Sequence, residues 1–240
     1  MTAVRVERDG PLLRITLARP ERRNAFDAAT IAELTAAFAD VGDARAVVLA
    51  GQGSSFSAGA DLEWMRASAA LSEAENVEDA LRARRMFEAV DGCPAPVVVR
   101  VQGHALGGGA GLVACADVAV AEPDAVFGFG EVKLGLAPAV ISPFVVAKIG
   151  PSAARRYFVT GERFDAETAR RIGLVHELSD DLDAGVERIV GELLAAAPQA
   201  IRAAKTLARG PLPAAETARI LAELRADAEA QERLKAFLDA

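Results

Sequence analysis

The sequence contains few of the residues that usually bind metal ions. Its 240 residues include two histidines and two cysteines, and Cys93 and Cys115 lack the short spacing of metal-ligating pairs. Zinc sites are built from Cys and His at characteristic short spacings. We therefore expect no metal site. Two unpatterned cysteines are more typical of a reducing compartment than of a secreted protein.

Positive charge and aromatic side chains are also scarce. The chain has 27 Lys and Arg against 34 Asp and Glu, which gives a formal net charge of −7, and aromatics make up 5% of the residues. Nucleic-acid binding would require a basic surface. The N-terminus has no apolar signal core, and no apolar run reaches the length of a membrane span. The sequence therefore predicts a cytoplasmic protein that binds neither nucleic acid nor membrane.

Apolar residues are abundant and fall into alternating strand-like and helix-like segments. They make up 52% of the chain. The expected strands and helices are strands 4–7, 12–17, 46–50, 97–101 and 118–121, and helices 28–40 and 78–90. Such alternation is typical of an α/β fold with a mostly parallel sheet. We expect a core domain over residues 1–184 and a helical C-terminal region over residues 185–240.

The most distinctive segment is a run of small residues at the start of an expected helix. Residues 107–111, all glycine except Ala110, directly follow an apolar stretch that begins with strand 97–101. Without side chains, another group can approach the backbone closely here. A helix N-terminus carries unpaired N–H groups and the positive end of the helix dipole, which suit an anion or a developing oxyanion. Tight packing of the helix against the strand is the alternative explanation.

A second loop of small residues follows the expected strand 46–50. It reads Ser57-Ala58-Gly59-Ala60-Asp61. Two such loops are able to supply one N–H donor each to a single oxygen, as in an oxyanion hole. The glycine run does not fit a dinucleotide-binding loop, because Leu112 stands where the last glycine of Gly-x-Gly-x-x-Gly belongs. A pair of plain turns is the alternative interpretation of these loops.

Three segments, in this order and spacing, resemble the enoyl-CoA hydratase/isomerase (crotonase) family. They run from Ser57 to Leu62, from Gly103 to Gly109 and from Phe127 to Leu136. The resemblance extends from about residue 12 to residue 205. It implies a spiral of ββα units with a helical C-terminal trimerisation region, assembled as a homotrimer or a dimer of trimers.

The resemblance also implies a chemistry. Members of the family bind acyl-CoA thioesters and stabilise an enolate on the thioester oxygen with two backbone N–H groups, which by motif position are those of Ala58 and Gly108. The family's catalytic glutamate falls on Glu131. Its neighbours Phe127, Phe129, Val132 and Leu134 would desolvate the carboxyl and raise its pKa. Without the motif, an exposed loop glutamate or an ion-pair partner of Lys133 is the favoured interpretation. The residues implied to contact the acyl-CoA are Ala58, Gly59, Ala60, Asp61, Gly108 and Gly111.

Gly111 departs from the pattern of many hydratases, which have a second glutamate at this position. In those enzymes the two glutamates share the activation of water and the delivery of a proton to C2. Isomerases that shift a double bond often use one glutamate. Hydration by Glu131 alone, isomerisation, and a catalytically silent acyl-CoA-binding protein therefore all remain open.

One more resemblance concerns the substrate. Segments 61–65, 109–112, 138–143 and 153–158 are similar to those of hydratases for 3-methylglutaconyl-CoA or related branched, carboxylated enoyl-CoAs. Gly111 would then leave room for such an acyl group. Candidates to face its carboxylate are Arg82, Arg84 and Arg85, although a solvated helix face is their default interpretation. Arg22 and Lys205 are candidates to meet the CoA phosphates.

The preferred interpretation is an enoyl-CoA hydratase, a hydro-lyase that adds water across the 2,3-double bond of an acyl-CoA. It would use an oxyanion hole and the single carboxyl of Glu131. The expected partners are an acyl-CoA substrate and further copies of the chain. No cofactor is expected beyond the coenzyme A that enters with the substrate.

Overall fold

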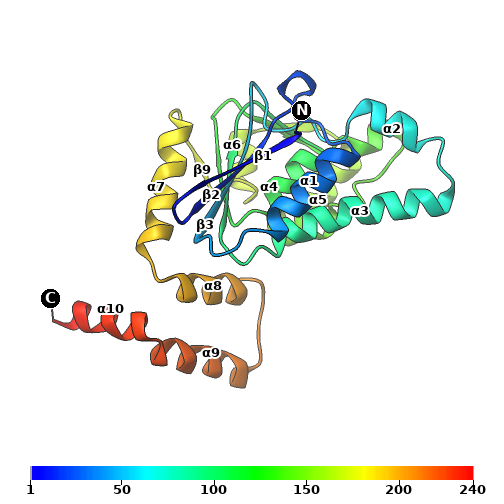
Figure 1. Cartoon of the computed structure of the whole chain (residues 1–240). Helices are drawn as coiled ribbons and strands as arrows, with labels where there is room; N and C mark the ends of the chain where they lie inside the picture. The colour runs from blue at the N-terminus through cyan, green and yellow to red at the C-terminus, as the bar shows by residue number, and fades with distance from the viewer. Residues whose placement is uncertain (1, 240) are drawn as a thin grey trace.

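The computed structural model describes residues 2–239, in which a mostly parallel sheet lies at the centre (Figure 1). Its strands are ordered β1-β2-β3-β4-β6-β9. Only β1 and β2 pair antiparallel; the other neighbours pair in parallel. The strand bounds are β1 (Val4–Asp9), β2 (Leu12–Leu17), β3 (Ala46–Gly51), β4 (Val97–Val101), β6 (Val118–Ala121) and β9 (Glu177–Leu178). The expected α/β fold is confirmed.

A second sheet of three short strands lies beside the first. It is ordered β5-β7-β8, with β5 (His104–Leu106) parallel to β7 (Val126–Gly128) and β7 antiparallel to β8 (Arg163–Asp165). The chain passes from β4 to β5 through Gly103, which has a φ of +56°. A Cβ at Gly103 would lie 2.0 Å from the Ser54 carbonyl oxygen, so this crossing requires glycine.

Helices cover both faces of the larger sheet. One face is covered by α1 (Ala28–Ala39), α3 (Glu73–Asp91) and α4 (Gly108–Cys115), and α5 (Ser142–Thr160) packs against α4. The other face packs on α7 (Leu182–Ala195). The alternation of strand side chains explains this division. Leu49 and Val99 belong to the main core, whereas their neighbours Val48 and Val98 pack against α7. The shorter helical segments are η1 (Pro20–Arg22), α2 (Leu62–Ser68), η2 (Glu131–Leu134) and α6 (Ala166–Arg171).

Helix α3 begins earlier than the apolar pattern predicts. Its first residue is Glu73 rather than residue 78, because Ser72 and Glu75 form a capping box. The Ser72 backbone N–H donates to the Glu75 carboxylate at 2.8 Å, and the Glu75 N–H donates to Ser72 Oγ at 3.3 Å. A capping box satisfies two backbone donors at once and so stabilises a polar first turn.

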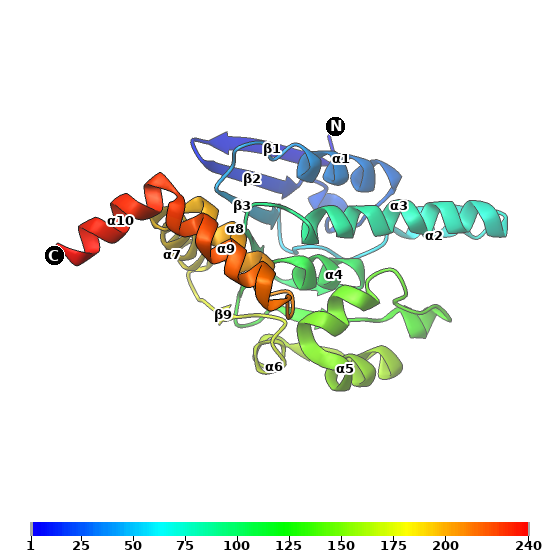
Figure 2. The same ribbon diagram turned by 90° about the horizontal axis from the view of Figure 1, so that it is seen from below.

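The last three helices form an arm that extends from the body of the molecule (Figures 1 and 2). They are α8 (Pro198–Leu207), α9 (Ala214–Ala226) and α10 (Ala228–Leu238). The boundary expected after residue 184 is misplaced, since it falls inside α7. Val186 and Val190 of α7 are buried against the sheet, so α7 belongs to the core and the arm begins after it. Within residues 2–239, none of the helices combines the length and hydropathy that a membrane crossing needs.

Candidate active site

Parallel pairing brings the three loops of interest to one edge of the fold. A bridge pairs Ser57 with Ala105 of β5 in parallel, and Ala105 pairs with Phe127 of β7. The chain therefore leaves all three segments in the same direction. The loop after Ser57, the glycine run after β5 and the segment that carries Glu131 after β7 all begin at this edge, where ligands of parallel sheets commonly bind.

Two glycines allow these loops to touch. Gly59 has a φ of +86°, and a Cβ there would lie 2.6 Å from the Leu106 carbonyl oxygen and 3.3 Å from the Gly108 nitrogen. Gly107 has a φ of +52°, and a Cβ there would lie 3.2 Å from Glu131 Oε1. A side chain at Gly59 would separate the first loop from helix α4. A side chain at Gly107 would be strained by the positive φ and would displace the Glu131 carboxyl slightly.

The backbone hydrogen bonds correct one expected donor. The Ala58 N–H donates to the Arg23 carbonyl at 2.9 Å and is not free to bind a substrate oxygen. The Asp61 N–H and the Gly59 carbonyl both bond to the backbone of Phe26, which turns the N–H of Ala60 away from Phe26. Within residues 2–239 the Ala60 N–H has no hydrogen-bond acceptor. The free donor of this loop is therefore that of Ala60, two residues from the expected one.

The second expected donor is free. Gly108 is the first residue of α4, and its N–H has no acceptor among the described residues. The first N–H groups of a helix have no partner within the helix, and the helix dipole adds positive potential there. Ala60 and Gly108 line the same cavity together with Glu131. The lining of this cavity thus includes two residues whose backbone N–H groups are unpaired among the described residues, and one carboxyl group.

Glu131 lies at the start of η2 and is half-buried. Its Oε2 atom is buried and has no hydrogen-bond partner within residues 2–239. The expected alternative, an ion pair with Lys133, is not formed among the salt bridges of the described residues. Burial raises the pKa of the Glu131 carboxyl above its ordinary value, because the charged form is poorly solvated there. A buried, unpaired carboxyl group with a raised pKa is suited to acid/base catalysis.

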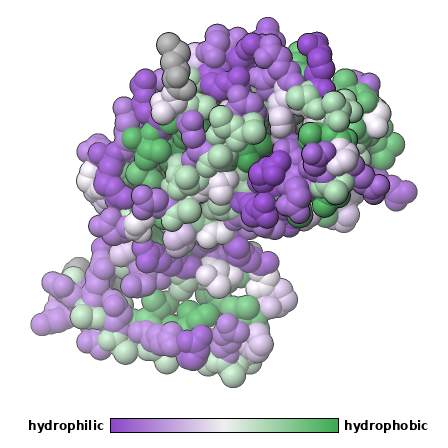
Figure 3. All heavy atoms as spheres, turned by 45° about the vertical axis from the view of Figure 1, so that its right-hand side comes forward, coloured by the Kyte–Doolittle hydropathy of each residue, from purple (hydrophilic) through white to green (hydrophobic). Residues whose placement is uncertain are grey.

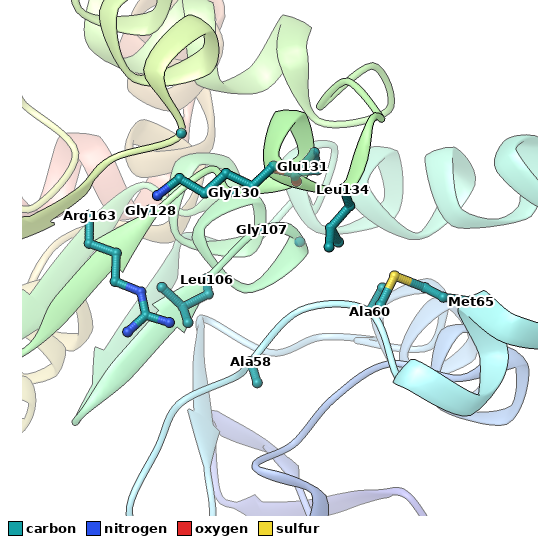
Figure 4. Close-up of a pocket in the computed structure, with 13 residues that line it drawn as sticks. Ala58, Ala60, Met65, Leu106, Gly107, Gly128, Gly130, Glu131, Leu134 and Arg163 are labelled. Carbon is teal, nitrogen blue, oxygen red and sulfur yellow. The ribbon is translucent and has the colours of Figure 1, made fainter.

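The cavity has two lobes that meet at Ala60, Gly108 and Glu131. The large lobe, of about 410 Å³, is lined chiefly by Met65, Leu106, Lys133, Leu134 and Arg163. In Figure 4, Arg163 points toward Leu106, while Met65 and Leu134 face each other from opposite walls. The small lobe, of about 160 Å³, is lined chiefly by Phe26, Ile31, Trp64, Met86, Phe87 and Ile141. Sequence reasoning had not assigned a role to Lys133, Arg163 or Ile141 at this cavity.

The expected role of Gly111 is wrong. This residue is buried and lines neither lobe. A Cβ at Gly111 would lie 2.5 Å from Ile141 Cγ2 and 3.0 Å from Phe87 Cε1. The absence of a side chain therefore does not make room for an acyl group, because Ile141 and Phe87 already fill that space.

Gly59 and Asp61 line neither lobe and instead shape the loop between Ser57 and Asp61. The Asp61 carboxylate accepts the Glu63 N–H at 2.9 Å and so caps α2. The same carboxylate pairs with Arg19 at 3.1 Å and is almost fully buried. Asp61 thus fixes the direction in which the chain leaves the loop, whereas Ala58 and Ala60 line the cavity.

The basic residues singled out in the sequence lie elsewhere. Arg82 pairs with Asp79, and Arg84 pairs with Glu88 and lies over the Phe144 ring. Together with Arg85, they line neither lobe. Arg22 and Lys205 also lie outside both lobes, where Arg22 pairs with Glu63 and Lys205 with Asp117. Within residues 2–239, no group of three or more His, Cys, Asp or Glu side chains is placed to hold a metal ion.

Comparison with known proteins identifies the family. The enoyl-CoA hydratase/isomerase family matches residues 7–237. A Rhodobacter capsulatus protein named "Probable enoyl-CoA hydratase" is 37% identical, with 98% of this chain and 95% of that protein covered. The cyclohexa-1,5-dienecarbonyl-CoA hydratase of Thauera aromatica is 34% identical, with 98% and 92% covered. Three longer enoyl-CoA hydratases of Alternaria alternata are matched over 66% of their length.

The fold agrees with this result. The crystal structure of an enoyl-CoA hydratase from Shewanella pealeana has a TM-score of 0.92 and 37% identity, with 99% of this chain and 93% of that chain covered. The protein has the crotonase fold, an architecture that combines mixed α/β sheets with C-terminal helices. The chain belongs to the enoyl-CoA hydratase/isomerase (crotonase) family. Its named relatives are hydratases, which is consistent with a hydro-lyase.

Proposed function

We propose that the protein is an enoyl-CoA hydratase, which adds water across the 2,3-double bond of an acyl-CoA thioester. The observation that carries this proposal is the meeting of two free backbone donors, those of Ala60 and Gly108, with the unpaired carboxyl of Glu131 in one cavity. The names of the relatives support the same reaction.

In this proposal the thioester oxygen binds between the N–H groups of Ala60 and Gly108. Addition of water at C3 moves negative charge onto that oxygen and forms an enolate. Two preorganised donors stabilise the enolate more than the neutral thioester, which lowers the barrier. The loop that contains Ala58 and Ala60 would border the pantetheine of coenzyme A.

Glu131 acts as the single acid/base group. Its carboxylate takes a proton from water as the water oxygen bonds to C3, and the same proton returns to C2 when the enolate collapses. One carboxyl group is therefore enough to accept the proton from water and to donate it to C2. Because hydration of a double bond is redox-neutral, the proposed reaction requires no redox cofactor, and coenzyme A enters as part of the substrate.

Isomerisation is the second candidate, favoured by the absence of a second carboxylate at Gly111. One carboxyl group is able to carry a proton between C2 and C4. A catalytically silent acyl-CoA-binding protein is the third candidate. Acyl-CoA binding alone does not explain an unpaired, half-buried glutamate beside two free donors.

Parallel assays of the wild type separate these candidates. Crotonyl-CoA, 3-methylglutaconyl-CoA and a 3-enoyl-CoA are incubated with the protein, and thioester absorbance is followed. Loss of absorbance with a 2-enoyl substrate supports hydration. A gain with the 3-enoyl substrate and no loss with the others supports isomerisation. No change with any of the three, while acyl-CoA still binds, supports a silent protein.

For the substrate, the sequence pointed to a branched and carboxylated acyl group. Its carboxylate would need a cationic partner in the acyl-binding lobe, and no Lys, Arg or His is among the residues that line the small lobe. One relative is named for the hydration of a ring-shaped, uncharged acyl group. We therefore propose an uncharged acyl substrate, with 3-methylglutaconyl-CoA as the comparison in the assay.

We also propose that the chain assembles as a homotrimer, alone or as a dimer of trimers, through its C-terminal arm. Apolar side chains stay exposed on α9 and α10, among them Leu221, Leu234 and Phe237, with Phe237 79% exposed. The arm shows green apolar surface among purple polar atoms in Figure 3. Exposed apolar surface of this kind is usually covered by a partner. Light scattering after size-exclusion chromatography should give the mass of three or six chains, and a monomer would contradict the proposal.

A further inference from the structure

The two lobes differ in charge in a way that assigns the two halves of the substrate. Lys133 and Arg163 line the large lobe, which is therefore the side suited to the anionic phosphates of coenzyme A. The small lobe contains one ionisable side chain, that of Glu131, and its other walls are apolar. The reacting carbons lie where the lobes meet, so the rest of the acyl group extends into the small lobe.

We propose that the small lobe selects an uncharged, compact acyl group of about six carbons, with Trp64, Met86 and Ile141 setting its length. This inference rests on the proposed function only in taking an acyl-CoA as the ligand. It concerns which acyl group binds, whatever reaction follows.

The exclusion of charge follows from the walls of the small lobe. A carboxylate there would be desolvated without a cationic partner and would lie near the carboxyl group of Glu131, which carries the same charge when ionised. An unpaired buried charge is strongly unfavourable. None of the α3 arginines, Arg82, Arg84 and Arg85, lines this lobe, and Arg82 and Arg84 pair with Asp79 and Glu88. An acyl group that ends in a carboxylate is therefore disfavoured.

The size limit follows from the volume. At about 160 Å³, the small lobe is close to the roughly 150 Å³ of an apolar cavity that accommodates benzene. Ile141 is almost fully buried and packs against the position of Gly111, so the lobe does not continue toward α4. Trp64 of α2 is only half-buried, although it packs against the main core. Trp64 is thus the wall whose removal would open the lobe without leaving a closed void.

Binding of saturated acyl-CoAs tests the inference without any turnover. Butyryl-, hexanoyl-, decanoyl- and glutaryl-CoA are titrated into the wild-type protein by calorimetry. Hexanoyl-CoA should bind about tenfold more tightly than butyryl-CoA, because two further methylenes are buried. Decanoyl-CoA should bind more weakly than hexanoyl-CoA. Glutaryl-CoA should bind about a hundredfold more weakly than hexanoyl-CoA. Equal or tighter binding of decanoyl- or glutaryl-CoA overturns the inference.

Two neighbouring variants sharpen the test. Trp64→Ala should shift the preference toward decanoyl-CoA and leave glutaryl-CoA weak, whereas Met65→Ala, in the large lobe, should change all four affinities by a similar factor. An unchanged order in Trp64→Ala contradicts the role of this wall. If that variant does not fold, the wild-type order decides alone. If the four acyl-CoAs bind in the expected order but crotonyl-CoA is not hydrated, the proposed reaction is wrong and this inference stands.

Discussion

The Cγ2 methyl of Ile141 lies in the space that a side chain at Gly111 would occupy, 2.5 Å from where its Cβ would be. Phe87 closes the same space from α3, with its Cε1 atom at 3.0 Å. Many hydratases of this family place a second glutamate at the position of Gly111. In this chain the position is a packed apolar contact, so it supplies no second carboxyl group to the cavity.

This contact predicts that Gly111 and Ile141 are energetically coupled. Gly111→Ala should lower the free energy of unfolding by about 1–3 kcal/mol, the usual range for overpacking a core. Ile141→Leu removes the Cγ2 branch, whereas Ile141→Val keeps it. Urea denaturation should therefore show a smaller effect of Gly111→Ala in the Ile141→Leu background than in the Ile141→Val background. Equal effects in both would mean that the contact is relieved by other movements.

The role of the Gly108 N–H can be tested with a matched pair of variants. Proline is tolerated at the first position of a helix, so Gly108→Pro should remove the donor while α4 persists. Gly108→Ala keeps the donor and adds the same Cβ, which would contact Phe26 at 2.9 Å in either variant. We expect kcat to fall by ~10²–10³ more in Gly108→Pro than in Gly108→Ala. Similar kcat values would argue against this donor.

Glu131 is expected to reduce stability at neutral pH. Burial raises its pKa, so the folded protein holds this proton more tightly than the unfolded chain. Below the ordinary glutamate pKa the group is protonated in both states and contributes nothing. As the pH rises through the raised pKa, the buried charge destabilises the fold. Glu131→Gln should match the wild type in free energy of unfolding near pH 4 and exceed it near pH 8; a constant difference at both pH values would contradict this.

Asn24 is expected to position the loop that carries Ala60. Its side-chain amide donates to the backbone carbonyls of Gln52 and Ser55 at 2.8 Å. The backbone carbonyl of Asn24 accepts the Ser57 hydroxyl at 2.8 Å. Asn24→Ala should lower the free energy of unfolding by about 1–3 kcal/mol, because buried carbonyls lose their donors. If the residue also positions the site, the variant loses kcat while it is still fully folded. Full activity in a folded Asn24→Ala variant would mean that Asn24 contributes to stability but does not position the site.

Local apolar patterns predicted the positions of β1, β2, β3, β4 and β6 and a mostly parallel sheet. The family, and with it the role of Glu131 beside the two small-residue loops, came from the resemblance of three motifs. The free donor was missed because the partner of the Ala58 N–H is the carbonyl of Arg23, a contact set by the tertiary path of the chain. Local spacing does not contain this information.

The same limit applies to Gly111. A missing side chain in a sequence does not reveal whether the space is open or filled, and here residues of two other segments, Phe87 and Ile141, fill it. The boundary of the core was misplaced for a related reason. Helix α7 has the composition of the C-terminal helices, yet Val186 and Val190 are buried on the sheet.

The most direct test of the account is the turnover of crotonyl-CoA by Glu131→Gln, with hexanoyl-CoA binding measured on the same preparation. Glutamine keeps the shape of the side chain and removes its ability to exchange a proton. We predict a loss of ~10²–10⁴ in kcat, the usual contribution of general acid–base catalysis, with hexanoyl-CoA affinity unchanged. Turnover at the wild-type rate would contradict the assignment of Glu131 as the acid/base group.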